Sequence, residues 1–207
     1  MVENRVVITG MGAITPLGLT SEKFWGNLLK GKSGIGPMTL CDSTDYPCHI
    51  AGEVKDFDPV QYVGARESRR MARFSQLAVA AALSAVESAD LNMDKEDPYK
   101  VGVVLGNGNG GFPELESNCR ILTEKGGMRM SPFFFPMVLP NMAAANVGHY
   151  VGAKGFNSTA STACAASNQA IGEALLAIRR GSIEVALAGG TEAGISKLGL
   201  AGFAVMR

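Results

Sequence analysis

Three short runs of β-branched and other apolar residues constrain the fold of this chain more than any other feature. Each run is apolar nearly throughout and is closely followed by glycine, which is typical of strands that are buried on both faces. Such strands occur in parallel sheets with helices packed on each side. The three predicted strands are residues 6–9 (VVIT), 101–105 (VGVVL) and 183–188 (IEVALA).

Helical patterns separate these predicted strands. Residues 21–29 open with a serine, a type that favours helix N-termini, and then place apolar side chains at helical spacing. Residues 69–89 are rich in alanine, and a third helix from about residue 164 to residue 180 ends before Gly181, the expected breaker. Strands that alternate with helices predict parallel pairing through right-handed crossovers, and hence a layered α/β fold.

Residues 110–150 fit this rhythm less well. The stretch SPFFFPMVLPNM contains three prolines and three consecutive phenylalanines, so it cannot form a regular buried helix. A loop this apolar must be covered, either by its own domain or by a second subunit. Because no repeat or low-complexity linker interrupts residues 1–207, we treat them as one domain.

Charge and cysteine usage exclude several classes of protein. Lys+Arg and Asp+Glu both count 19, so no bulk charge favours nucleic acid or a membrane surface. No apolar stretch reaches membrane-spanning length, and no signal peptide is recognised. The four cysteines form no CxxC pair and no metal-like spacing with His49 and His149. We therefore expect a cytoplasmic protein with reduced thiols and with neither a metal nor a cofactor.

Cys164 lies where a Ser/Thr-rich, strand-like run meets a helix, in NSTASTACAASNQ. The partial positive charge of a helix N-terminus stabilises a thiolate, and the same N–H groups can stabilise an oxyanion on a bound thioester. Small residues around the cysteine let the helix pack closely and leave room for an acyl group. A buried structural cysteine remains the alternative on local chemistry alone.

The motifs STACAAS, RVVITGMGAITPLG, GKSGIGPMT, VGVVLGNGNGG, SPFFFPMVLPNMAAANV and VALAGGTEA together resemble the β-ketoacyl-[acyl-carrier-protein] synthases, most closely the elongating types I and II. The similarity covers essentially the whole chain. It implies a thiolase-like fold, layered α/β with a mixed sheet, of which residues 1–207 are the N-terminal half. The final GLAGFAVMR has no polar tail and is similar to a segment near the middle of such enzymes, so we expect the C-terminal half to be absent.

The resemblance also implies an acyltransferase mechanism. Cys164 would take an acyl group from a phosphopantetheine-linked acyl carrier protein, with its own backbone N–H as one oxyanion donor. Decarboxylative Claisen condensation with malonyl carrier protein would then lengthen the chain by two carbons, in fatty-acid or polyketide synthesis. Phe203 matches a position that lines the acyl pocket. Asn109 stands where such enzymes often carry an apolar pocket residue, which puts a long-acyl preference in doubt.

One departure from the family concerns histidine. The family polarises the malonyl thioester with two histidines, in motifs of the HGTGT and GHxxGA kinds, and neither motif occurs here. We interpret His49 as a surface residue and His149 as a structural one. The chain alone is therefore expected to be acylated at best and inactive in condensation.

Arg66, Arg69, Arg70 and Arg73 are spaced as one stripe of a helix. A solvated face is the default interpretation, yet four like charges without acidic partners repel one another. The family docks its acidic carrier protein here, at positions that match Arg66, Arg69 and Arg70, and Arg129 is a further candidate. The resemblance also implies a homodimer, with the FFF stretch, the NMAAANV segment and the NSTAS strand at its interface.

Three alternatives stay open. Gly106, Gly108 and Gly111 spell GxGxxG after a strand, as in nicotinamide-binding enzymes, but no second strand with an acidic end follows. A polyketide or specialised-lipid ketosynthase would differ in the absent half. A non-condensing chain-length-factor-like subunit typically lacks the active-site cysteine, so Cys164 argues against it. Cys41, Cys48 and Cys119 are interpreted as structural or incidental thiols.

Overall fold

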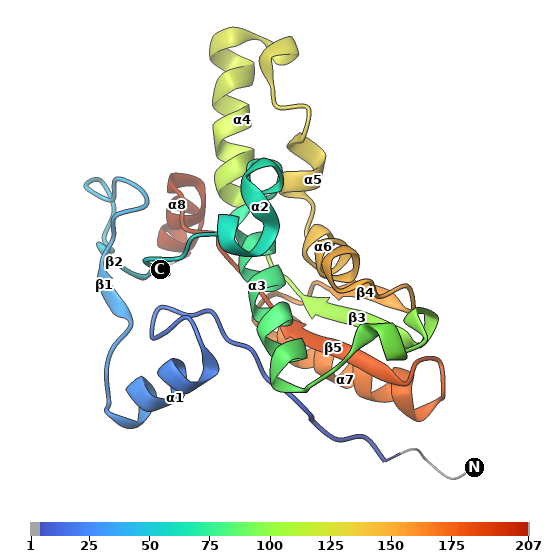
Figure 1. Ribbon diagram of the computed structural model, residues 1–207. Coiled ribbons are helices and arrows are strands. Elements are labelled where there is room, and N and C mark those ends of the chain that lie inside the picture. Colours follow the sequence, from blue (N-terminus) through green and yellow to red (C-terminus); the bar gives the residue numbers. More distant parts are fainter. Residues whose placement is uncertain (1–4, 207) are drawn as a thin grey trace.

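The computed structural model describes residues 5–206. Its centre is a three-stranded parallel sheet with the strand order β4-β3-β5 (Figure 1). The strands are β3 (Val101–Gly106), β4 (Asn157–Ala160) and β5 (Val185–Gly190). The strand predicted at 101–105 is confirmed, and the one predicted at 183–188 is shifted towards the C-terminus.

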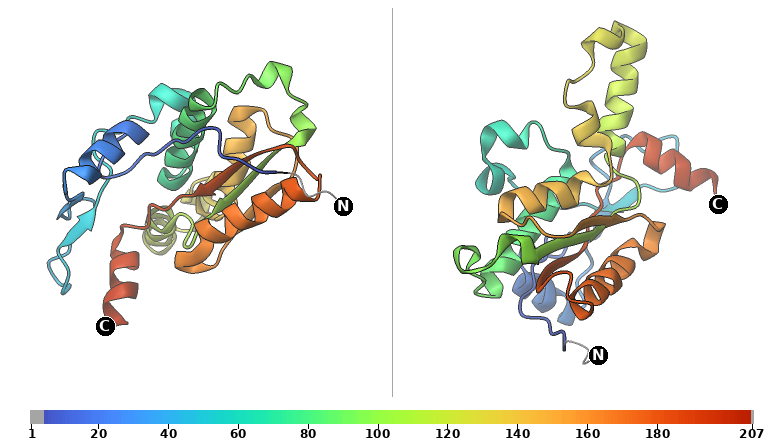
Figure 2. Two further views of the ribbon diagram at one scale, coloured as in Figure 1. Left: turned by 90° about the horizontal axis from the view of Figure 1, so that it is seen from below. Right: turned by 90° about the vertical axis from the view of Figure 1, so that its right-hand side faces the viewer.

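Helices cover both faces of this sheet, as the layered prediction requires (Figure 2). The helices α3 (Arg73–Ser88) and α6 (Met142–Val151) pack on one face, and α7 (Ala166–Arg179) packs on the other. Successive residues of β3 point to opposite faces, so Val103 joins the α3–α6 core whereas Val104 joins the α7 core. Every residue of β3 is buried, and each buried valine contributes about 1.5–3 kcal/mol to stability.

The end of α7 follows the sequence prediction. Gly181 adopts a positive φ of 76°, which glycine reaches without a steric penalty. Its N–H donates to the carbonyl of Ile178 (2.9 Å), and the N–H of Ser182 donates to Ala177 (3.0 Å). These two hydrogen bonds form a Schellman motif, which satisfies carbonyls that the helix end would otherwise leave unpaired.

The predicted strand at residues 6–9 is wrong. These residues are extended but form no strand, and Val7 and Ile8 are 60% and 84% exposed. A β-branched run becomes a strand only where a neighbour completes the hydrogen-bond ladder, and none does so within residues 5–206. The chain instead crosses α3 at Gly10 and Gly12, where added Cβ atoms would collide with the backbone of that helix.

An arm outside the sheet carries α1 (Ser21–Leu29) and an antiparallel hairpin of β1 (Ile35–Pro37) and β2 (Ile50–Gly52) (Figure 1). The α1 bounds agree with the prediction. Its N-cap is Thr20, whose hydroxyl accepts the N–H of Lys23, so the cap lies one residue before the predicted serine. The chain therefore has parallel and antiparallel pairing in two separate sheets.

The region of residues 110–150, which fits the strand–helix rhythm less well, is mostly helical. It contains α4 (Phe112–Lys125), the 3-10 turn η3 (Gly127–Arg129) and α5 (Phe134–Val138), and α4 projects away from the sheet (Figure 1). The prediction that SPFFFPMVLPNM forms no regular buried helix is confirmed, because α5 is short and has no buried residue. The remaining elements are α2 (Val60–Ser68), α8 (Lys197–Val205) and the 3-10 turns η1 (Met93–Lys95), η2 (Pro98–Lys100) and η4 (Ala163–Ala165). No helix within residues 5–206 is both long and apolar enough to cross a membrane.

Candidate functional site

Cys164 lies at the carboxyl edge of the parallel sheet. The strands β3, β4 and β5 end there at Gly106, Ala160 and Gly190, and the chain passes from β4 through the turn η4 into α7. Cys164 is the middle residue of η4, so the regular helix begins two residues later than predicted, at Ala166. The side chain is exposed, which contradicts the alternative of a buried structural cysteine.

Glycines at two strand ends let α7 approach the sheet closely. A Cβ on Gly106 would collide with backbone atoms of Ala166 and Ser167, and one on Gly190 would lie 2.8 Å from the Cβ of Ser167. Real Cβ atoms do not make such contacts, so these positions require glycine. Ala166 and Ala170 are buried at the same interface. The small residues around Cys164 therefore bring the first turn of α7 onto the sheet.

The turn that carries Cys164 has an unusual backbone. Ala163 has a φ of +50°, in the left-handed region, which costs a residue with a Cβ about 1–2 kcal/mol. The N–H of Ala165 donates to the carbonyl of Thr162 (3.1 Å), which closes the turn. Within residues 5–206 the N–H of Cys164 has no acceptor. It is thus available to an oxyanion on an acyl group bound to the sulfur.

The loop after β3 is tied to the other strand ends by Asn107, a residue that the sequence analysis missed. Asn107 is 1% exposed. Its N–H donates to Ala160 at the end of β4 (3.0 Å), and its side-chain amide donates to the carbonyl of Thr191 after β5 (2.7 Å). Its side-chain oxygen accepts the N–H of Gly110 (2.6 Å). One buried residue, through its backbone N–H and its side-chain amide, therefore joins all three strand ends beside η4.

Glu192 is a second missed residue in the same loop cluster. Its Oε2 accepts the N–H groups of Gly108 (3.1 Å) and Asn109 (3.0 Å). These are the donors that a GxGxxG loop offers to a phosphate, so a carboxylate of the chain already occupies them. The strand that follows α4 along the chain, β4, is Asn157–Ala160 and lacks the acidic residue with which the second strand of a dinucleotide site ends. The geometry therefore disfavours the nicotinamide alternative.

The loop that carries Asn109 passes close to the turn that carries Cys164, whereas Phe203 lies on α8. Asn109 is half-buried and directly follows Gly108, whose added Cβ would be 3.8 Å from the Cα of Ala163. Phe203 lies on α8, which packs against α4, and is 62% exposed. The ring of Phe203 is therefore uncovered within residues 5–206, and its place in an acyl pocket stays a prediction.

The arginine stripe is not a single helix. Residues 69–72 separate α2 from α3, so the helix predicted from Arg69 begins only at Arg73. The Arg73 guanidinium turns inward, lies 4.6 Å from the centre of the Phe57 ring and donates to the carbonyls of Val54 and Phe57. Burial lowers the pKa of Arg73. Arg73 is therefore a structural residue.

The other arginines have contacts that the sequence did not predict. Glu67 pairs with Arg66 (3.8 Å) and with Arg70 (3.2 Å), so the group is not free of acidic partners. The Arg70 guanidinium also lies 4.8 Å from the centre of the Phe133 ring. Arg66 and Arg69 are exposed beside it, while Arg129 lies in η3 beyond the outer end of α4.

The two histidines and the remaining cysteines lie apart from the cysteine turn. Nδ1 of His49 is 3.3 Å from the Ser43 hydroxyl, and His149 is exposed on α6. Cys41, Cys48 and Cys119 are free thiols, and burial together with nearby Glu116 and Glu53 raises the pKa of Cys41. Within residues 5–206 no group of acidic, cysteine or histidine side chains has the arrangement of a metal site.

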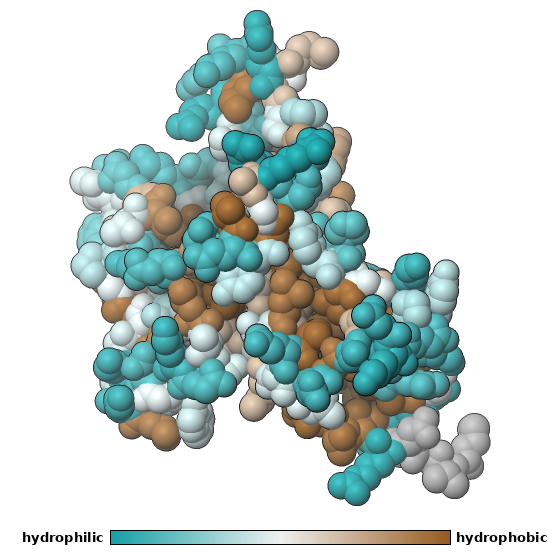
Figure 3. All heavy atoms as spheres, viewed as in Figure 1, coloured by the Kyte–Doolittle hydropathy of each residue, from teal (hydrophilic) through white to brown (hydrophobic). Residues whose placement is uncertain are grey.

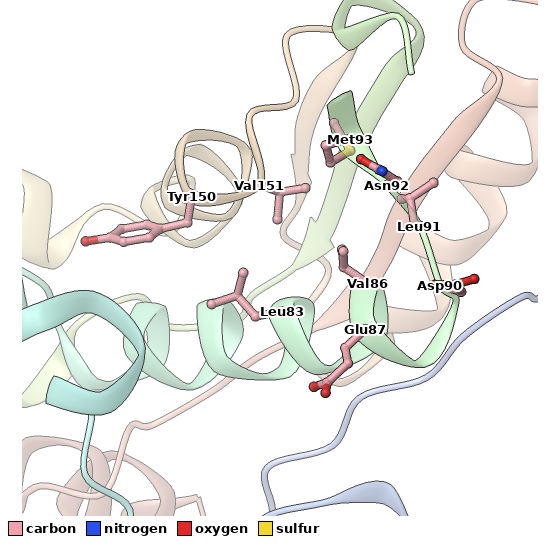
Figure 4. A pocket seen from close by; sticks show the side chains of 9 residues that line it. All are labelled: Leu83, Val86, Glu87, Asp90, Leu91, Asn92, Met93, Tyr150 and Val151. Atoms are coloured by element: carbon pink, nitrogen blue, oxygen red, sulfur yellow. The ribbon is translucent and has the colours of Figure 1, made fainter. Parts of the chain in front are cut away.

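Two hollows are lined by residues of other elements. A hollow of about 510 Å³ between α3 and α6 is lined by apolar and acidic side chains, including Leu83, Val86, Glu87 and Tyr150 (Figure 4). Figure 3, which has the same view as Figure 1, shows apolar side chains on the surface of the molecule. A second, more polar hollow of about 450 Å³ lies between the first loop and the hairpin. Neither is lined by a predicted site residue.

Comparison with known proteins agrees with this geometry. The family model described as beta-ketoacyl synthase, N-terminal domain, matches residues 3–207. A 3-oxoacyl-[acyl-carrier-protein] synthase 2 from Synechocystis sp. is 44% identical over 205 residues, which are 99% of this chain and 49% of that protein. The chain thus spans about half the length of the curated relatives it matches.

Two solved structures share the fold. The ishigamide ketosynthase/chain length factor superimposes with a TM-score of 0.91 at 28% identity, over 99% of this chain and 51% of the other. A type II polyketide ketosynthase in complex with its acyl carrier protein gives a TM-score of 0.83 at 29% identity, over 97% and 55%. The fold is therefore that of a thiolase-like ketosynthase, as the sequence predicted.

Proposed function

Because the chain belongs to the β-ketoacyl synthase family, we propose that Cys164 is the acyl-accepting nucleophile of a 3-oxoacyl-[acyl-carrier-protein] synthase. One observation carries the proposal: the exposed thiol stands on a turn at the carboxyl edge of the sheet, beside a backbone N–H that has no acceptor within residues 5–206. The sulfur attacks the thioester carbonyl of the acyl carrier protein, and the carrier's phosphopantetheine thiolate leaves with the cysteine's proton. The product is an acyl-cysteine and a free carrier thiol.

The second half-reaction needs groups beyond this chain. Malonyl carrier protein loses carbon dioxide, and the resulting enolate attacks the acyl-cysteine to give a 3-oxoacyl carrier protein and the cysteine thiolate, which takes up a proton from solvent to become the thiol again. His49 lies beside Ser43 between β1 and β2, and His149 is exposed on α6, which supports a source outside residues 5–206 for the histidines that polarise the malonyl thioester. We propose that residues 1–207 supply the nucleophilic half of the enzyme and that condensation requires a C-terminal half.

Carrier docking is proposed at Arg66, Arg69 and Arg70. They lie at the end of α2 and in the break that follows it, so they present cations from a bend rather than from one helix. Phe133 adds an apolar element beside Arg70. A related polyketide ketosynthase has been solved with its acyl carrier protein, which supports the same class of partner here. Arg129 joins the surface only if the carrier also reaches η3.

The acyl pocket is proposed to include Asn109 on the cysteine side and Phe203 from α8. Phe203 can contribute only if a further part of the protein covers its exposed ring. A polar Asn109 favours short or oxygenated acyl groups over long saturated chains.

A homodimer and a cytoplasmic location complete the proposal. β4 is an edge strand, with no partner on its outer side within residues 5–206, and Phe135 is 67% exposed. An unpaired edge and exposed aromatic side chains suit contact with a second copy.

Fatty-acid elongation is preferred over the polyketide and chain-length-factor alternatives, because the curated relatives are named 3-oxoacyl-[acyl-carrier-protein] synthase 2.

Covalent labelling of the cysteines by cerulenin tests the proposal. Cerulenin, which alkylates ketosynthase cysteines, is expected to modify Cys164 in the wild type and to leave the Cys164→Ala protein unmodified. Peptide mapping compares this site with Cys119, an exposed thiol on α4 that serves as an internal control. Equal modification of Cys119 and Cys164 would refute a selective nucleophile.

A further inference from the structure

One carboxylate holds the loop between β3 and α4 in place. Oε2 of Glu192 accepts the N–H groups of Gly108 (3.1 Å) and Asn109 (3.0 Å), and Oε1 accepts the N–H of Ala193 (3.2 Å). Both oxygens therefore have backbone donors. Hydrogen bonds to a carboxylate are stronger than those between neutral groups, so this contact restrains the loop more than an uncharged side chain would.

The restrained loop lies against the residue that precedes the nucleophile. A Cβ on Gly108 would be 3.8 Å from the Cα of Ala163 and 3.9 Å from its carbonyl oxygen. Ala163 has a φ of +50°, and such a backbone persists only where its surroundings hold it. The loop held by Glu192 is one of those surroundings.

The same contact orients Asn109. The Asn109 N–H is bound to Glu192, and its side-chain Nδ2 lies 3.3 Å from where a Cβ on Gly194 would stand. The main chain of Asn109 is thus held by Glu192, and its side chain lies near the segment that follows β5. A shift of the Glu192 carboxylate would move Asn109 relative to the cysteine turn.

We propose that Glu192 is a positioning residue that acts through Gly108 and Asn109 to set the acyl-binding side of Cys164. The inference rests on the proposed function, because it assigns Glu192 a part in acyl transfer. Glu192 acts without contact to the sulfur. It fixes the backbone of Gly108 and Asn109, and this backbone forms the acyl-binding side of Cys164. Its loss slows acyl transfer and changes discrimination between short and long acyl groups, since both depend on how Asn109 and the turn are placed.

The test uses the protein expressed from its complete reading frame and compares four forms. The four forms are the wild type, Glu192→Ala, Glu192→Gln and Glu116→Ala. The last of these is the matched control. Oε2 of Glu116 accepts the N–H of Leu198 (2.7 Å), so the control also removes a carboxylate bound to a backbone donor, but at the α4–α8 contact. Intact-mass spectrometry follows acylation of Cys164 by a short and a long acyl thioester.

Glu192→Ala is expected to slow acylation about ten- to hundredfold, the effect of a displacement of about 1 Å at a reacting group. The ratio of short-chain to long-chain rates is expected to change with it. Glu192→Gln keeps an oxygen that accepts the N–H groups of Gly108 and Asn109 more weakly, and its rate and ratio are expected to lie between those of wild type and Glu192→Ala. Glu116→Ala is expected to behave as wild type.

The outcomes separate this inference from the proposed function. An unchanged rate ratio in Glu192→Ala, or the same change in Glu116→Ala, overturns the positioning role while acylation of the wild type upholds the function. Failure of wild-type Cys164 to accept either acyl group overturns the function itself. If Glu192→Ala does not fold, Glu192→Asp decides, because its shorter carboxylate is expected to shift the ratio in a folded protein and an unchanged ratio refutes the role.

Discussion

Replacing Gly106 by alanine tests how tightly the cysteine turn is built onto the sheet. The new Cβ would collide with the backbone of Ala166 and Ser167, which cannot swing aside as a flexible side chain can. Overpacking of this kind costs about 1–3 kcal/mol, and the upper end applies because backbone must move. The smaller conformational freedom of an unfolded alanine offsets about 0.4–1 kcal/mol. The net loss is about 2 kcal/mol, which lowers the melting temperature by about 4–8 °C.

Gly172→Ala is the matched control on the same helix. Gly172 lies within α7, and nothing stands within 4 Å of its added Cβ. Alanine at such a position stabilises a helix by about 1 kcal/mol, so the melting temperature is expected to rise by about 2–4 °C. Thermal denaturation by circular dichroism and the rate of iodoacetamide labelling at Cys164 are measured on both variants.

The Gly106→Ala variant is also expected to change the labelling rate of Cys164 while Gly172→Ala leaves it unchanged. A Gly106→Ala protein with wild-type melting temperature and wild-type labelling rate would refute the close packing of α7 on β3.

Three further outcomes are expected. Glu53→Gln lowers stability by about 1–3 kcal/mol at pH 7, because the buried carboxylate accepts bonds from the Thr39 hydroxyl and from the N–H groups of Thr39 and Leu40. Burial raises the pKa of Glu53, but these hydrogen bonds outweigh burial, and the pKa of the folded protein is lowered. The stability that Glu53→Gln loses in thermal denaturation is therefore largest above the ordinary glutamate pKa of about 4.3. The difference from wild type shrinks as the pH falls through the pKa that Glu53 has in the folded protein. Gly181→Ala, which forces a φ of 76° on a residue with a Cβ, costs about 1–2 kcal/mol in urea denaturation, and an unchanged midpoint would contradict the helix end described here. Arg66→Glu weakens binding of an acidic acyl carrier protein at least about tenfold at low salt and less at high salt. If calorimetry shows that the wild type and the Arg66→Glu variant bind the carrier equally well, this surface is removed from the docking proposal.

Residue patterns confined to one segment predict part of this fold. An apolar run ending in glycine predicted β3, and a breaker at Gly181 predicted the end of α7, because burial and left-handed backbone leave direct marks on residue type. The same reasoning placed Cys164 at a strand-to-helix junction. It did not predict that a 3-10 turn separates the cysteine from the regular helix.

The errors came from interactions that depend on distant residues. Residues 6–9 have strand composition, but a strand also needs a pairing neighbour, which composition does not report. The four arginines have helical spacing in the sequence, but they lie on both sides of the break between α2 and α3. Spacing alone does not report such a break.

The roles of Asn107 and Glu192 were missed for a related reason. Both side chains bond mainly to backbone groups, and a backbone N–H has no sequence signature. A polar residue placed directly after a buried strand is the one signal that could have drawn attention to Asn107.

Acyl transfer to Cys164 is the most direct test of the account. The protein is incubated with an acyl carrier protein that bears a hexanoyl group, and the modified peptide is identified by mass spectrometry. The account predicts one acyl group per chain, as a hydroxylamine-labile thioester on Cys164, and none in the Cys164→Ala protein. An acyl group on another residue, or an unmodified wild-type protein, would contradict it.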